Sequence, residues 1–308
     1  MTTTTDRVAP ATHQGPEGDR EEVAGRLLRS SAKQSHDPAT EIDWDAPLDP
    51  GLFGLNPPWC SLYATPLWEE MTPEQRVSLT RHEVGSIMST GIWFEMILQQ
   101  MILRDQYTAD PSTAEFQFAL TEIADECRHS IMFARACQRM DVPHYLPSKA
   151  ARELGRGLKT VATGETAYAA ILVAEEILDV MQRDWMRGDD VVHLVRETSR
   201  IHVVEESRHM KFARQEIREH LAGVSERRRK MSALVIAIAA HVIVSSMVNP
   251  GVYAAAGLDP QRARREAAAS EHRRTMMRTS SAHLMQFLSD VGLLTPAAAR
   301  IYRRIHML

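Results

Sequence analysis

The sequence predicts an all-α protein whose core is an antiparallel bundle of long helices. Glycine is scarce, at 15 of 308 residues, and aromatic residues make up 6%, which argues against a β-sandwich, a barrel or a glycine-rich nucleotide fold. Signals for helix starts and stops divide the chain into long segments joined by short loops, and no segment alternates polar and apolar residues as a strand would. With 44% hydrophobic residues, the chain can bury a sizeable core.

Residues 1–24 are predicted to be a disordered leader, and residues 25–308 a single domain. The leader is rich in Thr, Pro and Gly and has no apolar stretch of signal-peptide length, so nothing indicates export. Three scattered cysteines without a Cys-x-x-Cys pattern argue against a disulfide framework and fit the cytoplasm. A net charge of −4 gives no reason to expect nucleic acid as a partner.

Helix signals predict four long helices in the first two thirds of the chain. Residues 72–75, Thr-Pro-Glu-Gln, form a capping box with proline at the first helical position. Asp-Pro-Ser at 110–112 begins the next helix, while Pro143 and Gly188 mark later ends. The expected helices cover about residues 72–104, 110–140, 166–187 and 189–220.

The apolar segment 231–248 predicts a fifth helix and raises the question of a membrane. It is barely long enough to span a bilayer, and His241 lies in its middle. A buried helix of an all-α core gives the same pattern, so we expect no membrane contact and a core position for His241. Asp259-Pro260 begins a sixth helix, and shorter helices follow to the C-terminus.

Two pentapeptides inside the predicted helices indicate metal binding. They are Asp-Glu-Cys-Arg-His at 125–129 and Glu-Glu-Ser-Arg-His at 205–209. Each contains Glu-x-x-His, whose two side chains project from one helical face about one turn apart and can hold a metal ion together. One Glu-x-x-His would be weak evidence, but here two occur in the same acid-Glu-x-Arg-His context.

A repeated spacing links the pentapeptides to two more glutamates. Glu95 precedes Glu126 by the same number of positions as Glu175 precedes Glu206, so the two halves of this region superimpose on each other. The length of this spacing suits an antiparallel helical hairpin that returns to the same level. Two such hairpins would present Glu, Glu-x-x-His, Glu and Glu-x-x-His to the interior, the ligand set of di-iron and di-manganese carboxylate bundles.

The charges of these side chains need compensation, which two divalent cations would supply. Four carboxylates on the inward faces of a bundle would repel one another and be costly to desolvate. Carboxylate and imidazole ligands suit iron or manganese. We expect Asp125 and Glu205 to accept hydrogen bonds from the ligand histidines, and Arg128 and Arg208 to hold these acids in place.

His202 breaks the symmetry of the two halves, because the first half has Glu122 at the equivalent position. It lies four residues before Glu206, on the same helical face. As a third imidazole ligand it would make one metal ion richer in nitrogen than the other. The alternative interpretation is a core histidine bonded to a neighbouring carboxylate.

Residues 201–209, Ile-His-Val-Val-Glu-Glu-Ser-Arg-His, resemble the AurF-like arylamine N-oxygenases, a family of ferritin-like di-iron oxygenases. The mark of that family is a third histidine ligand one turn before the second Glu-x-x-His, which here falls on His202. The similarity extends to Val-Ala-Glu at 173–175, the helix around Glu95, and Ile-Asp-Trp-Asp at 42–45. It implies a ferritin-like four-helix bundle core with additional C-terminal helices.

The resemblance also implies the site and the activity. Carried over residue by residue, the ligands of two iron ions, with manganese as an alternative, fall on Glu95, Glu126, His129, Glu175, His202, Glu206 and His209. Glu126 and Glu206 are the expected catalytic residues, as glutamates that bridge or shift between the ions, and Glu176 is an alternative to Glu175. The implied reaction oxidises a primary, aromatic amine with O2 toward a hydroxylamine, nitroso or nitro product. The resemblance further implies a homodimer, an external electron donor or reductase, and a role in secondary metabolism such as antibiotic biosynthesis.

Two other functions use similar residues. A di-iron oxygenase acting on carbon, such as a hydroxylase or desaturase, has the same ligands, and a ferritin-type metal or oxidative-stress protein has a similar bundle. The long extension past residue 220 argues against a minimal ferritin. His202 is the feature that favours oxidation of nitrogen over oxidation of carbon.

Overall fold

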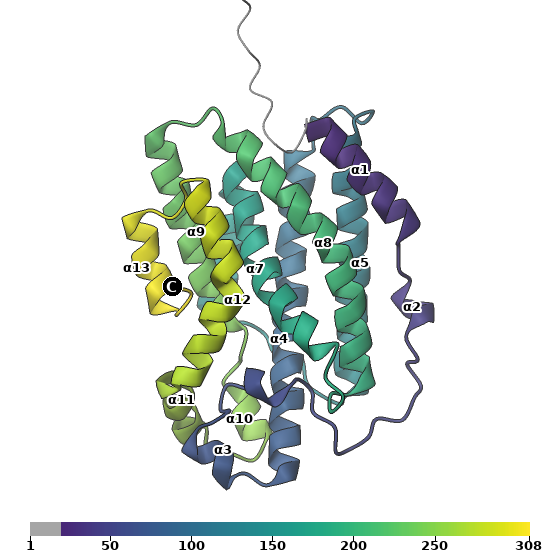
Figure 1. Ribbon diagram of the computed structural model, residues 1–308, viewed down its shortest axis with the longest axis vertical. Helices are drawn as coiled ribbons and strands as arrows, with labels where there is room; N and C mark the ends of the chain where they lie inside the picture. The colour runs from purple at the N-terminus through teal and green to yellow at the C-terminus, as the bar shows by residue number, and fades with distance from the viewer. Residues whose placement is uncertain (1–19) are drawn as a thin grey trace, which may run out of the picture.

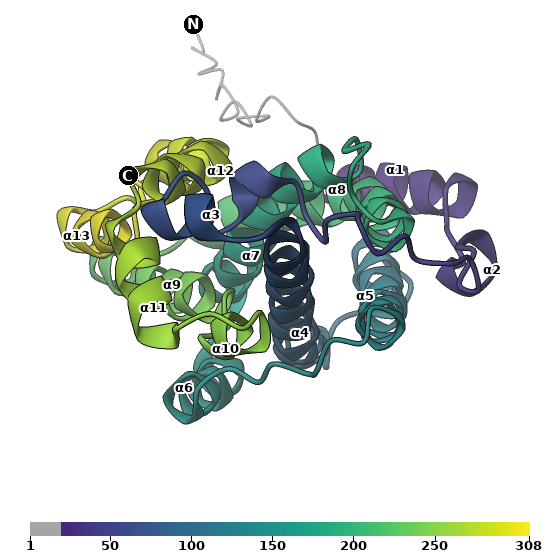
Figure 2. The same cartoon turned by 90° about the horizontal axis from the view of Figure 1, so that it is seen from below.

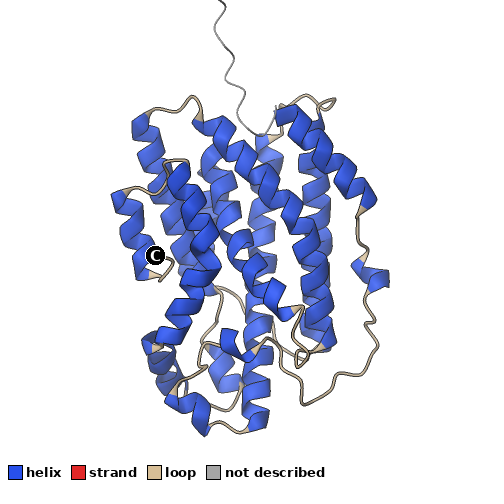
Figure 3. Cartoon of the chain, in the orientation of Figure 1, coloured by secondary structure: helices blue, strands red, loops and turns tan. Residues whose placement is uncertain are grey.

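The computed structural model describes residues 20–308, and every regular element within that range is helical (Figures 1 and 3). An isolated bridge between Phe53 and Val191 is the β-type pairing found in the described range. The helices are α1 (Arg20–Lys33), α2 (Pro38–Glu41), the 3₁₀ turn η1 (Pro57–Trp59), α3 (Pro66–Glu70), α4 (Pro73–Asp105), α5 (Ala114–Arg139), α6 (Lys149–Val161), α7 (Gly164–Trp185), α8 (His193–Leu221), α9 (Glu226–Ser246), α10 (Gly251–Ala255), α11 (Pro260–Ala269), α12 (Glu271–Asp290) and α13 (Pro296–Arg304).

The helices α4, α5, α7 and α8 form a four-helix bundle, which confirms the predicted all-α fold and its four long helices. The pairs α4–α5 and α7–α8 are two hairpins, and they meet through contacts of α5 with α8 and of α4 with α7 (Figure 1). The predicted capping box begins α4. Its Thr72 hydroxyl accepts a hydrogen bond from the Gln75 backbone N–H at 3.2 Å, and the Gln75 side chain accepts one from the Thr72 N–H at 3.1 Å.

The leader predicted for residues 1–24 is too long, because α1 begins at Arg20. The guanidinium of Arg20 pairs with Glu216 on α8 and with Glu115 on α5, and Ala24 is fully buried. The helix thus gains both charge partners and an apolar contact with the bundle, which the polar composition of this stretch did not indicate. The rest of the predicted leader, residues 1–19, lies outside the described residues.

The sequence did not predict α6, which packs against both α4 and α9 beside the bundle (Figure 2). Its two glycines, Gly155 and Gly157, lower its intrinsic helix propensity. The side chain of Ser148 nevertheless caps its first turn by accepting a hydrogen bond from the Ala151 N–H at 3.2 Å. Packing against its neighbours therefore stabilises a helix that its composition alone would not.

The predicted apolar fifth helix is α9, which packs against α7 and α13 on one side of the bundle. Within Glu226–Ala255 an 18-residue window is long and apolar enough to cross a membrane, and 44% of it is buried in the protein. The expected fully buried core helix is therefore only partly buried, and His241, expected in the core, is exposed. The reason is that α9 lies at the outside of the bundle, where Met231, Leu234 and Ile238 on one of its faces are exposed in the described part of the chain.

Candidate metal centre

The side chains predicted to be metal ligands meet inside the four-helix bundle, where all of them are buried. All four bundle helices contribute: Glu95 from α4, Glu126 and His129 from α5, Glu175 from α7, and His202, Glu206 and His209 from α8. Their donor atoms form overlapping groups of three, and within each group the atoms lie within 4.8 Å of one another. The repeated spacing therefore does return each hairpin to one level, as the sequence predicted.

The centre of this arrangement is a cluster of two glutamates and two histidines from the two pentapeptides. The Nδ1 atom of His129 lies 3.0 Å from Glu126 and 3.3 Å from Glu206. The Nδ1 atom of His209 lies 3.0 Å from Glu126 and 3.1 Å from Glu206. Both imidazoles thus direct Nδ1 at the same two carboxylates, one from α5 and one from α8.

The opposite ring nitrogens of these histidines are held by the other acids of the pentapeptides. The Nε2 atom of His129 lies 2.8 Å from Glu205, and that of His209 lies 3.2 Å from Asp125, so each histidine reaches an acid on the opposite helix. Arg128 pairs with Asp125, and Arg208 lies 3.8 Å from Glu205. These contacts confirm the predicted partners. An N–H donated at Nε2 leaves the Nδ1 lone pair free for a metal ion.

Glu95 and Glu175 face the cluster from the other two helices. One oxygen of Glu95 accepts a hydrogen bond from the Ser130 hydroxyl. One oxygen of Glu175 has no hydrogen-bond partner, and Glu175 groups with His202 and Glu206. The adjacent Glu176 instead accepts a hydrogen bond from Arg214 at 2.8 Å. The geometry therefore favours Glu175 over Glu176 as a metal-binding group, in agreement with the repeated spacing.

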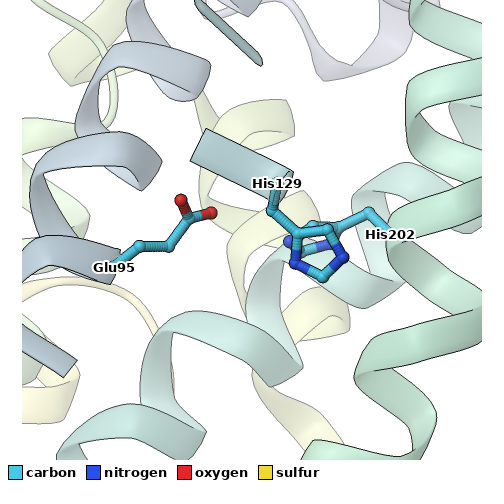
Figure 4. A group of neighbouring side chains, drawn as sticks. All are labelled: Glu95, His129 and His202. Carbon is cyan, nitrogen blue, oxygen red and sulfur yellow. The ribbon is translucent and has the colours of Figure 1, made fainter. Parts of the chain in front are cut away.

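His202 lies among the candidate ligands with both ring nitrogens unpartnered. Figure 4 shows the Glu95 carboxylate directed toward the imidazoles of His129 and His202. Both nitrogens of His202 are buried without a hydrogen bond, and the nearest carboxylate oxygen, on Glu206, is 3.7 Å away. Burial lowers the pKa of His202 to about 4, so the ring is a neutral base. The alternative, a core histidine satisfied by a carboxylate, does not describe this environment.

Glu122 is a site residue that the sequence analysis did not select. Its carboxylate groups with Glu126 and His209, and both of its oxygens are buried without a hydrogen-bond partner. Glu122 precedes Glu126 by four residues, just as His202 precedes Glu206 by four residues in the second helical hairpin. That equivalence in spacing was the available signal, but a glutamate gives no sign of facing inward until the helix rotation is known.

The unpartnered donors fit two metal ions and little else. Buried carboxylates and imidazoles normally have hydrogen-bond partners, because leaving them without one is costly. Here one oxygen each of Glu175 and Glu206, both oxygens of Glu122 and both nitrogens of His202 lack them. A second group of possible metal-binding side chains consists of Asp105, Glu216 and His220. It differs from the centre because Arg20 pairs with Glu216 and already supplies a positive charge.

Without metal, the charges in the centre have to be balanced by protons. Burial raises the pKa of Glu95 to about 8, and it raises the pKa values of Glu122 and Glu175 well above the ordinary range. Burial also opposes the charged form of His129 and His209, but the facing carboxylates outweigh it and raise both pKa values. Metal ions entering this site would replace those protons, as expected for a centre built to hold cations.

The variant Glu122→Gln should separate stability from metal binding. The amide has nearly the same shape and no charge to bury, so we expect the metal-free protein to be at least as stable as the wild type in urea unfolding. Metal affinity should fall by roughly tenfold, since one oxygen donor is weakened. The exposed Glu219→Gln on α8 is the control and should change neither quantity. Unchanged metal affinity in Glu122→Gln would show that Glu122 does not serve the centre.

The fold and the site together define a ferritin-like protein with a carboxylate- and histidine-lined centre for two metal ions, the class of di-metal oxidases and oxygenases. A family model described as P-aminobenzoate N-oxygenase AurF matches residues 17–292. The chain therefore belongs to the AurF family, as the residues around His202 had indicated.

The chain is also similar, at low sequence identity, to individual proteins and solved structures. Proteins from Mycobacterium tuberculosis and Mycobacterium bovis, both named as uncharacterized, are 24% identical to the chain over 294 residues, which is 92% of this chain and 86% of each relative. Two variants of an R2-like ligand-binding oxidase with a reconstituted Mn/Fe cofactor align with TM-scores of 0.44. They are 11% and 10% identical, and the alignments cover 94% and 96% of this chain and 92% and 97% of those chains.

Proposed function

We propose that this protein is a non-haem di-iron monooxygenase that oxidises a primary aromatic amine with O2 toward a hydroxylamine, nitroso or nitro product. The observation that carries the proposal is His202, a neutral and unpartnered imidazole that faces the same space as Glu95 and His129. Membership of the AurF family supports nitrogen rather than carbon as the atom oxidised.

In this proposal the seven predicted ligands hold two iron ions, with Glu122 as a further oxygen donor beside Glu126 and His209, and manganese is the alternative metal. Glu126 and Glu206 take the central positions, since each of them belongs to two donor groups. When bound, the metal ions supply the redox chemistry that activates O2. The chain holds the histidines in one tautomer through Asp125 and Glu205, and orients Glu95 through Ser130.

The first oxidation step defines what else must be present. One oxygen atom of O2 enters the N–H bond of the amine to give a hydroxylamine, and the other leaves as water. This balance needs two electrons and two protons from outside, so the proposal includes an external electron donor or reductase. It also includes a homodimer, a cytoplasmic location and a single domain that contains α1. Metal analysis, size-exclusion chromatography and product analysis with a reductant test these parts separately.

The variant His202→Ala tests the assignment to amine oxidation. We expect the rate of N-oxidation of an arylamine, measured by product chromatography, to fall by roughly 100-fold, with an altered absorption spectrum of the iron-loaded protein. His241→Ala, which removes an exposed histidine of α9, should behave as the wild type. An unchanged N-oxidation rate in His202→Ala would show that His202 is not a metal ligand needed for the reaction. Oxidised carbon products with no N-oxidised ones would instead favour a hydroxylase.

A further inference from the structure

Two adjoining cavities lie between the surface and the candidate metal centre. The outer cavity, of about 260 Å³, is lined by residues of α4, α6 and α9. The inner cavity, of about 30 Å³, is bordered by Glu95, Glu175 and His202. Phe94 and Ile243 line both cavities and so form the boundary between them. The inner cavity therefore reaches three of the groups that would bind metal, and the side chains of Phe94 and Ile243 lie between it and the outer cavity.

The two cavities differ in size, so they would hold different parts of one ligand. A cavity of about 150 Å³ is enough to hold benzene, so the outer cavity holds an aromatic ring with an apolar substituent. The inner cavity has roughly the volume that one water molecule occupies in the liquid. It has room for an amino group but not for a ring. A ligand in both cavities would thus present its nitrogen to the metal side and its ring to the outside.

The walls of the outer cavity disfavour a charged ligand. They are made by apolar side chains and glycines, and the single ionisable lining residue is Glu153, an exposed acid. None of the lining residues is a cation that could pair with a carboxylate or phosphate on a ligand. The mouth is apolar too, since Leu154, Val161 and Ile238 are exposed. An anionic ligand would lose its hydration here without compensation.

From this geometry we infer that the outer cavity is the substrate pocket and that it takes a neutral, apolar primary arylamine without an acidic group. This inference rests on the proposed function, and it narrows the substrate class. Its amino group passes Phe94 and Ile243 and reaches the space bordered by Glu95, Glu175 and His202. An aminobenzoate, which carries a carboxylate, is a poor ligand of this pocket.

Gly157 offers a way to fill the pocket without disturbing the fold. It lines the outer cavity, and a Cβ atom added to it would meet no heavy atom within 4 Å. By contrast, a Cβ on Gly155 would come within 2.6 Å of Trp93. Because Gly157 lies within α6, its replacement by phenylalanine also favours the helix. Thr160→Phe adds the same ring at an exposed position of α6 that does not line the cavity.

The test is calorimetric titration of the metal-loaded protein, without reductant, using 4-ethylaniline and 4-aminobenzoate. We expect 4-ethylaniline to bind at least about tenfold more tightly than 4-aminobenzoate. Gly157→Phe should weaken binding of 4-ethylaniline by about tenfold or more, while Thr160→Phe should bind it as the wild type does. Both variants should keep the metal content of the wild type, and neither should melt at a lower temperature than the wild type.

The outcomes distinguish the pocket from the proposed reaction. Tighter binding of 4-aminobenzoate, or unchanged 4-ethylaniline binding in Gly157→Phe, would overturn the assignment of the pocket even if amines are oxidised. If 4-ethylaniline binds as expected but no reductant yields an N-oxidised product, the pocket stands and the proposed reaction fails.

Discussion

A double variant, Glu126→Gln with Glu206→Gln, should lose both metal ions together with all oxygenase activity. Three of the four donor groups in the centre contain one or both of these glutamates, so only the group of Glu95, His129 and His202 stays complete when both carboxylates are gone. Elemental analysis of the wild type should give about two metal ions per chain. The double variant should retain roughly a tenth of that content or less.

The control for this experiment is already present in the chain. Glu176→Gln removes the same charge one residue from Glu175, but the side chain of Glu176 faces Arg214 rather than the cluster. We expect this variant to keep two metal ions. Far-ultraviolet circular dichroism should show that the double variant is folded. A folded double variant that still binds two ions would mean that the centre does not depend on its central pair.

Six of the seven proposed ligands could be predicted from periodicity and spacing, whereas His202 was assigned through the resemblance of residues 201–209 to a known family. Two residues three apart on a helix share a face in any helical structure, so Glu126 with His129, and Glu206 with His209, follow from the sequence. The equal spacing within the two hairpins added Glu95 and Glu175, because both hairpins are regular. These relations need no knowledge of how the helices are rotated against one another.

The features that were not predicted depend on tertiary packing. Whether Glu122 faces inward is decided by the rotation of α5 against α8, and the exposure of His241 by which face of α9 is covered. The helix α6 forms despite two glycines because it packs against α4 and α9. The apolar pocket lies between these helices, so it too could not be inferred from the sequence.

The metal-free protein should become less stable as the pH rises from 6.5 to 8, whereas the metal-loaded protein should not. In this window the buried carboxyl of Glu95, with a pKa of about 8, keeps its proton in the folded state, but the unfolded chain has already lost it. The raised pKa values of Glu122, Glu175, His129 and His209 act in the same direction. Because the folded state binds more protons than the unfolded state, its stability falls as the pH rises.

The histidines whose pKa values are lowered, His202, His82 and His306, oppose this trend only weakly and mainly near pH 6.5, where the unfolded chain still binds part of a proton at each of them. His202, with a pKa of about 4, is neutral in the folded state above pH 6.5 and mostly neutral in the unfolded state, while Glu206 is ionised in both. Glu95 alone should therefore reduce the free energy of unfolding by roughly 1 kcal/mol per pH unit on average, and by less as the pH approaches 8. Urea unfolding at pH 6.5, 7.2 and 8 would measure the slope.

Metal should abolish the slope, because bound cations replace the protons and keep the carboxylates ionised at every pH in the window. The apparent metal affinity should accordingly rise steeply with pH, by at least about tenfold per unit for each proton released. A metal-free protein whose stability is flat or rises over this range would show that the centre is not protonated as its burial requires. In that case the negative charges of the carboxylates would be neutralised by groups other than bound protons.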